Sequence, residues 1–168
     1  RDAAGNDIAS SGGNYPRQGN NISDVANVKA DLTKPYIASV TATPTTGNFG
    51  IHSATHANEI PITIIFNEVV DLDAAAEITI YLDAKGATGL TPIGRSDITT
   101  VGGVSQATAT YQVAEGDASA RLSVNSIAIT SADFTKLKDA LDYNANSAVS
   151  LARQGGTDLV DNTNLVIE

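Results

Sequence analysis

Three residues with oxygen-bearing side chains alternate near the end of the sequence. Asp142, Asn144 and Asn146 form an Asp-x-Asn-x-Asn pattern, the spacing with which helix–loop–helix calcium loops begin. The full EF-hand pattern is not met, because Ser147 occupies the sixth position, where Gly is wanted, and Arg153 the twelfth, where Glu is wanted. Ca²⁺ binds several hard oxygen ligands in flexible geometry. The sequence therefore predicts calcium in a looser loop site.

Other clusters offer the same oxygen ligands. They comprise Glu68 with Asp71 and Asp73, Asp2 with Asn6 and Asp7, and Asp117 after Gly116. Asp and Asn also cap turns by accepting hydrogen bonds from their own main chain, and this alternative stays open for each cluster. The residues predicted as calcium ligands are Asp71, Asp73, Asp142, Asn144 and Asn146.

The two histidines, His52 and His56, have a spacing that suits zinc when the segment is helical. They lie in a Ser, Thr and Ala loop, and Glu59 is the only nearby third ligand. A closed zinc site needs four ligands, so we interpret the pair as surface histidines. The chain has no Cys and none of the common nucleophile, phosphate-loop or dinucleotide motifs. We expect no enzymatic activity.

The amino-acid composition excludes some classes of binding partner. The net charge is −9 and hydrophobic residues make up 42% of the 168-residue chain. A negative surface repels nucleic acid and anionic lipid and attracts divalent cations. No apolar run reaches the length of about 18 residues that a membrane helix needs. We predict a globular chain with no nucleic-acid partner and no membrane insertion.

Short runs rich in Val, Ile, Thr and Tyr, separated by turn residues, predict an all-β fold from residue 35 onward. The predicted strands are 36–43, 60–66, 78–82, 107–113 and 121–129. In the last of these the alternation changes phase near Asn125, which is typical of a bulge. The stretch from 83 to 106 is Gly-rich and is expected to be weakly structured.

One segment, residues 131–142, has helical spacing instead. Phe134, Leu137 and Leu141 recur three and four residues apart, after a capping hydroxyl in Thr130 or Ser131. We expect a short helix that covers one end of the sheet structure.

The chain also carries an internal repeat. Arg17-Gln18-Gly19 matches Arg153-Gln154-Gly155, and the matches continue from Asp24 and Asp161 to Asp31 and Glu168. Self-similarity at a fixed offset is the signature of a tandem array. Residues 1–31 are therefore interpreted as the tail of a preceding unit, or as a strand donor, and residues 32–168 as a complete unit.

Four elements in order resemble bacterial immunoglobulin-like tandem repeats of large secreted or cell-surface adhesins. They are Asp2-Ala-Ala-Gly-Asn6, the Lys34–Val40 opening, the Ile62–Val70 run containing Phe-x-Glu-x-Val, and the Tyr111–Asp117 element Tyr-x-Val-x-x-Gly-Asp. The resemblance implies an immunoglobulin-like antiparallel β-sandwich, and calcium at sandwich ends and joints between repeats. It adds Asp31 and Glu168 as candidate joint ligands.

The resemblance further implies a structural or adhesive module at the bacterial cell surface. Such a module spaces and stiffens its chain, and its partners are neighbouring repeats or copies of itself, with a host or matrix ligand left open. One alternative is a self-assembling S-layer or filament subunit joined by strand addition. Another is a carbohydrate-binding module, which would need Tyr15, Tyr36 and Tyr143 on one exposed face.

Overall fold

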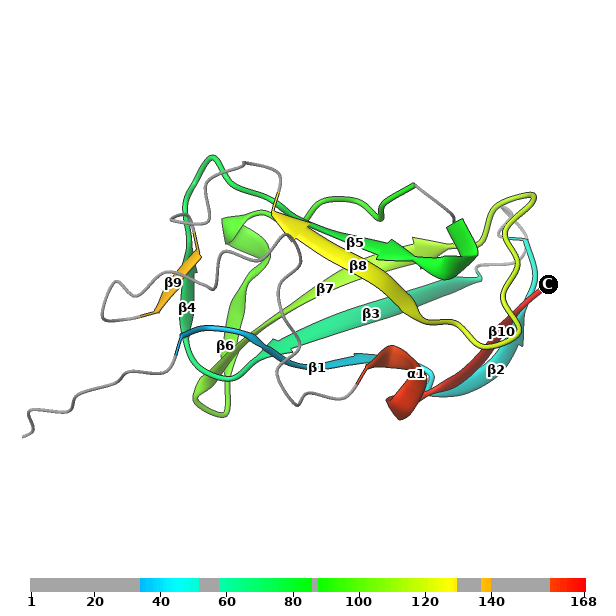
Figure 1. Ribbon diagram of the computed structural model, residues 1–168, viewed down its shortest axis with the longest axis horizontal. Helices are drawn as coiled ribbons and strands as arrows, with labels where there is room; N and C mark the ends of the chain where they lie inside the picture. The colour runs from blue at the N-terminus through cyan, green and yellow to red at the C-terminus, as the bar shows by residue number, and fades with distance from the viewer. Residues whose placement is uncertain (1–33, 52–57, 86–87, 130–136, 140–157) are drawn as a thin grey trace, which may run out of the picture. The chain divides into compact units, whose positions relative to one another are not determined.

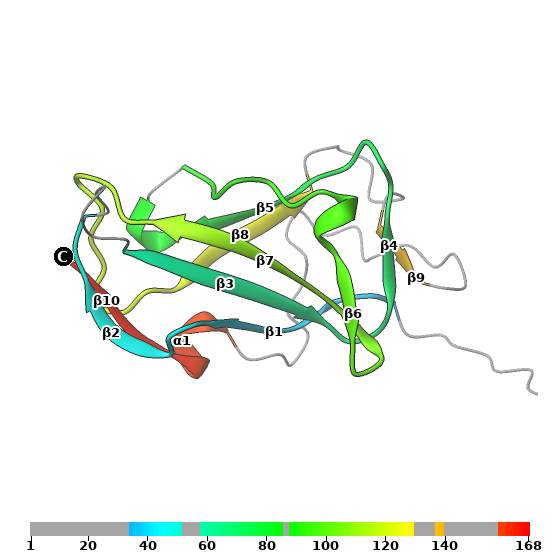
Figure 2. The same ribbon diagram turned by 180° about the vertical axis from the view of Figure 1, so that it is seen from behind.

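A computed structural model describes residues 34–51, 58–85, 88–129, 137–139 and 158–168. This part of the chain is mostly β, with antiparallel sheets and one short helix. Figures 1 and 2 show it from opposite sides. The interpretation of residues 1–31 lies outside the described residues. No described helix has the length and apolar character needed to cross a membrane.

The largest sheet has four strands in the order β1-β3-β7-β6. These are β1 (Ile37–Ala42), β3 (Glu59–Phe66), β7 (Val104–Gln112) and β6 (Thr99–Val101). Alternation places one face of β3 in the core, where Ile62, Ile64 and Phe66 are at most 1% exposed. The first, second and fourth predicted strands are thereby confirmed.

A second antiparallel pair joins β5 (Ile78–Leu82) to β8 (Val124–Ile129). Its inward side chains belong to the same hydrophobic core as those of the four-stranded sheet. Tyr81 lies opposite Ser126 and Leu82 opposite Val124, so Asn125 is an extra residue in β8. The bulge predicted from the phase change is confirmed.

A parallel pair contains the last described strand. β2 (Thr46–Phe49) pairs with β10 (Asn164–Ile167), which follows helix α1 (Leu159–Asn162). Asp158 caps this helix, and its carboxylate accepts a hydrogen bond from the Leu159 N–H at 2.6 Å. β2 lies between the first two predicted strands, 36–43 and 60–66, where only turn residues were expected, and it corrects that expectation.

The predicted helix over 131–142 is wrong where the structure describes it. Leu137–Asp139 form strand β9, which pairs antiparallel with β4 (Val70–Leu72). Leu137 is fully buried opposite Leu72, also fully buried. The pairing and core contact outweigh the local helical spacing. The rest of 131–142 lies outside the described residues.

The stretch from 83 to 106 carries more order than expected. It contains two 3₁₀ turns, η1 (Asp83–Lys85) and η2 (Arg95–Asp97), before β6. Between the turns, residues 89–93 run along the free side of β5, where Ile93 exchanges main-chain hydrogen bonds of 2.8 and 2.9 Å with Ile78. A Cβ at Gly89 would overlap the Thr79 side chain, so close approach to β5 requires this glycine.

Candidate functional site

The predicted calcium ligands Asp71 and Asp73 have other partners in the structure. Asp71 lies on the exposed side of β4, and its carboxylate forms an ion pair with Arg95 at 2.8 Å. Asp73 accepts the main-chain N–H of Ala75 at 2.9 Å, which is the turn-capping role left open above. The structure thus assigns each carboxylate a partner within the fold.

The remaining predicted ligands divide between the described and undescribed parts. Glu168 is exposed at the end of β10, and its main-chain N–H donates to the Phe49 carbonyl at 3.0 Å. Within the described ranges, no three His, Asp or Glu residues come together as a metal-binding group. The ligands outside these ranges are Asp31, Asp142, Asn144 and Asn146.

The histidine and tyrosine interpretations fall mainly outside the described residues. His52, His56, Tyr15 and Tyr143 are not described, whereas Glu59 accepts a hydrogen bond from the Gln112 side chain at 2.8 Å. Tyr36 is partly buried at the start of β1.

The carboxylate of Asp117 contacts polar groups of three other residues. Its Oδ2 accepts hydrogen bonds from the Tyr111 hydroxyl at 3.1 Å and the Ala114 N–H at 2.9 Å, and lies 3.3 Å from Lys85 Nζ. The Lys85 and Asp117 side chains are 16% and 11% exposed. Lys85 Nζ also lies 5.3 Å from the centre of the Tyr111 ring, within cation–π range. Asp117 was predicted as part of a family element and as a member of an oxygen cluster, but its partners Tyr111, Ala114 and Lys85 were not predicted.

Burial raises the pKa of Tyr111 well above its ordinary value. Desolvation is the largest cause, followed by the hydrogen bond to Asp117 and the negative charges of Asp117 and Asp83. Each of these favours the neutral phenol over the phenolate. The cluster therefore holds a protonated tyrosine against a carboxylate, which fastens the turn after β7 to η1.

The alkaline stability of the protein should report this tyrosine. Unfolded Tyr111 loses its proton near its ordinary pKa of 10.0, whereas the folded phenol keeps it to higher pH. Above that pH the unfolded state binds fewer protons, so this contribution to stability is fully present below pH 10.0 and falls as pH rises. Urea unfolding at about pH 8 and about pH 11 should show a smaller alkaline loss for Tyr111→Phe than for the parent. Equal losses would contradict the assignment.

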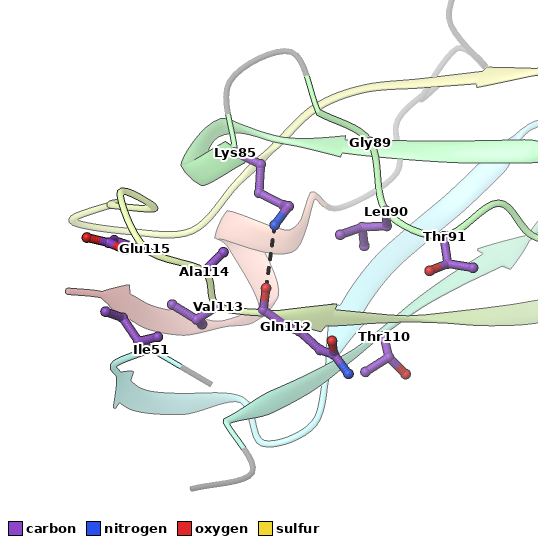
Figure 3. Close-up of a pocket in the computed structure, with 10 residues that line it drawn as sticks. All are labelled: Ile51, Lys85, Gly89, Leu90, Thr91, Thr110, Gln112, Val113, Ala114 and Glu115. Atoms are coloured by element: carbon purple, nitrogen blue, oxygen red, sulfur yellow. Dashed lines mark hydrogen bonds between the residues drawn. The ribbon is translucent and has the colours of Figure 1, made fainter. Parts of the chain in front are cut away.

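A pocket of about 580 Å³ opens beside this cluster. Figure 3 shows Leu90 and Thr91 on one side of it, Thr110 and Gln112 on the other, and Lys85 reaching the Gln112 carbonyl. That contact is 3.5 Å long. The lining combines apolar Ile51, Leu90 and Val113 with polar groups. The lining includes Lys85, whose ammonium is paired with the Asp117 carboxylate.

No family model, no curated protein and no solved structure matches this chain when it is compared with known proteins.

Proposed function

We propose that the chain is an immunoglobulin-like structural or adhesive repeat of a large bacterial surface protein, which spaces and stiffens the chain that contains it. Its setting is extracellular, and its partners are neighbouring repeats. The proposal draws on the order of elements that resembles bacterial immunoglobulin-like repeats and on the strand arrangement described above.

The strand order supports an immunoglobulin-like sandwich. The second layer extends beyond β5 and β8, because Ser119 and Ile167 exchange main-chain hydrogen bonds of 3.1 and 2.8 Å and the Leu122 N–H donates to Leu165 at 2.8 Å. Residues 119–122 lead into β8, so β10 lies between this segment and β2. An order β2-β10-β8-β5 opposite β1-β3-β7-β6 accounts for these contacts.

The spacer proposal rests on the directions in which β1, β2 and β10 run. In both views β1 begins at one end of the described unit and leads toward β2, which ends beside the C-terminus (Figures 1 and 2). Because β2 and β10 are parallel, tension applied at the start of β1 and at the end of β10 pulls the two strands in opposite directions along their length. All the hydrogen bonds between them are then loaded together. This suits a module that transmits force in series.

The proposal includes calcium, bound either at the joints between modules or in a loop. The net charge of −9 means that successive modules repel at low ionic strength, and a divalent cation between carboxylates relieves that repulsion. The predicted ligands for this role are Asp142, Asn144 and Asn146 in one loop, and Asp31 and Glu168 at joints. Thermal unfolding with calcium, with magnesium and with chelator tests this part separately.

Single-molecule pulling in two geometries tests the spacer proposal. The chain has no Cys, so single introduced cysteines give specific handles. Handles at Lys34→Cys and Glu168→Cys load the β2–β10 pair in shear, whereas handles at Gly50→Cys and Glu168→Cys lie at the same end of the parallel strands and separate them one bond at a time.

The expected result is an unfolding force several-fold higher in the shear geometry. Gly50 is a suitable position because a Cβ there meets no atom within 4 Å. Equal forces in the two geometries would overturn the mechanical role.

A further inference from the structure

Half of β7 has an open edge. β6 pairs with β7 only from Val104 to Gln106, whereas β7 continues to Gln112 and pairs with β3 along the other side as far as Glu59. Beyond Gln106 the described residues place no strand against the free side of β7. Exposed main-chain edges of this kind are templates for strand addition.

The unpaired groups on this edge belong to Thr108 and Thr110. Pro61, which faces Thr110, directs its carbonyl away from β7 to accept the Thr43 N–H of the β1 end at 3.1 Å. Directly opposite residues in an antiparallel pair either bond to each other or both point away. The N–H and C=O of Thr110, and those of Thr108 two residues earlier, therefore point to the open side.

The open edge of β7 faces a groove. The main-chain groups on the far wall of this groove are already hydrogen-bonded to β5. The pocket of about 580 Å³ and a second of about 280 Å³ both have Thr91 and Thr110 in their lining, so they adjoin along β7. The far wall is the 89–93 segment, whose Leu90 and Ile93 N–H groups donate to Ile80 and Ile78 at 2.8 Å. Between two such walls a single extended strand fits better than the edge of another folded sheet.

The charges and side chains that line the groove indicate which kind of peptide strand would bind there. Asp97 and Glu115 line the two ends of the groove, and Lys85, the one cation among the described residues that line it, is paired with Asp117. The first pocket is apolar at Leu90 and Val113. A segment with aliphatic side chains in its centre and Lys or Arg at its ends complements both features.

We propose that the Thr108–Gln112 edge of β7 binds an extended, positively charged peptide segment by β-strand addition. The main chain of the segment supplies hydrogen bonds to Thr108 and Thr110, and its aliphatic side chains enter the groove. This binding site is independent of the spacer role, since it uses neither β2 nor β10.

A matched pair of variants at Thr110 isolates the main-chain contribution. Thr110→Pro removes the N–H that points to the groove and leaves the β3–β7 hydrogen bonds intact, because proline is tolerated where its nitrogen faces away from the ladder. Thr110→Val keeps the N–H and removes only the exposed hydroxyl. The probe is a labelled peptide, Lys-Thr-Val-Thr-Val-Thr-Lys, and its counterpart with Glu in place of Lys.

In fluorescence anisotropy, the Lys peptide should bind the parent and Thr110→Val with similar affinity and bind Thr110→Pro at least tenfold more weakly. The Glu peptide should bind the parent more weakly than the Lys peptide. By amide exchange, Thr108 and Thr110 should exchange faster than Ala109 in the free protein and become protected by the Lys peptide. Thermal unfolding of both variants verifies that they remain folded.

Several outcomes would overturn the proposal. Equal binding to the folded Thr110→Pro variant would show that the edge is not used, as would amides of Thr108 and Thr110 that stay unprotected when the peptide binds. Self-association of the parent that Thr110→Pro abolishes, without peptide binding, would assign the edge to a second copy of this chain instead.

Discussion

Replacing Asp117 with Ala is expected to lower the free energy of unfolding by about 3 kcal/mol. The substitution removes the acceptor of the Tyr111 hydroxyl and of the Ala114 N–H, and the partner of Lys85. Tyr111 is fully buried, so its hydroxyl cannot readily exchange Asp117 for water. Loss of one partner from a buried polar group costs more than the group contributed when paired. Urea unfolding at neutral pH measures the difference.

Asp71→Ala is the matched control for this change. Its ion pair with Arg95 is shorter, at 2.8 Å, but the two side chains are 61% and 55% exposed. Exposed ion pairs contribute little because solvent screens them, and we expect a loss of about 0.5 kcal/mol or less. If the two substitutions lower the free energy of unfolding by the same amount, burial is not the reason why the Asp117 cluster stabilises the fold.

Leu165→Ala is expected to destabilise the protein by about 3 kcal/mol. Leu165 is fully buried on β10, and its main-chain carbonyl accepts the Leu122 N–H. Truncation leaves a cavity between β10 and the core, which neighbouring strands fill only in part. Denaturant unfolding measures the loss.

Val166→Ala is its control within the same strand. Val166 is partly buried on the other face of β10, so we expect a cost of about 1 kcal/mol or less. Similar costs for Leu165→Ala and Val166→Ala would mean that β10 does not close the core through Leu165.

Strong alternation made much of the fold predictable. Residues 60–66 carry large apolar side chains at every second position, and β3 follows that pattern within one residue. The change of phase in 121–129 even located the bulge at Asn125, because a bulge moves the inward side chains by one residue. Patterns of this kind depend on the sequence near the strand and not on distant partners.

Elements whose order comes from distant partners were not predictable. Thr46–Phe49 includes Gly47 and Asn48 and has no alternation, and it forms β2 by pairing with β10. Leu137 fits a helical stripe as well as a buried strand position, and β4 decides between them. Such contacts can override local spacing in either direction.

For the candidate sites, the sequence identified the side chains with oxygen donors but not the groups that they contact. Asp73 belongs to a cluster of oxygen donors, yet its carboxylate accepts the N–H of Ala75. Asp117 was recognised as an oxygen donor after Gly116, but Lys85 lies 32 residues before it. The open edge of β7 carries no signal in its own residues, because it depends on where β6 ends.

The position of β10 has a consequence for the order in which the chain folds during synthesis. The side chain of Asn162, just before β10, donates to the Val40 carbonyl 122 residues earlier in sequence, and β10 itself inserts between β2 and residues 119–122. This sheet therefore stays incomplete on a ribosome until β10 has emerged. Closing such long loops is slow. The strands that flank β10 are therefore synthesised before the strand that joins them.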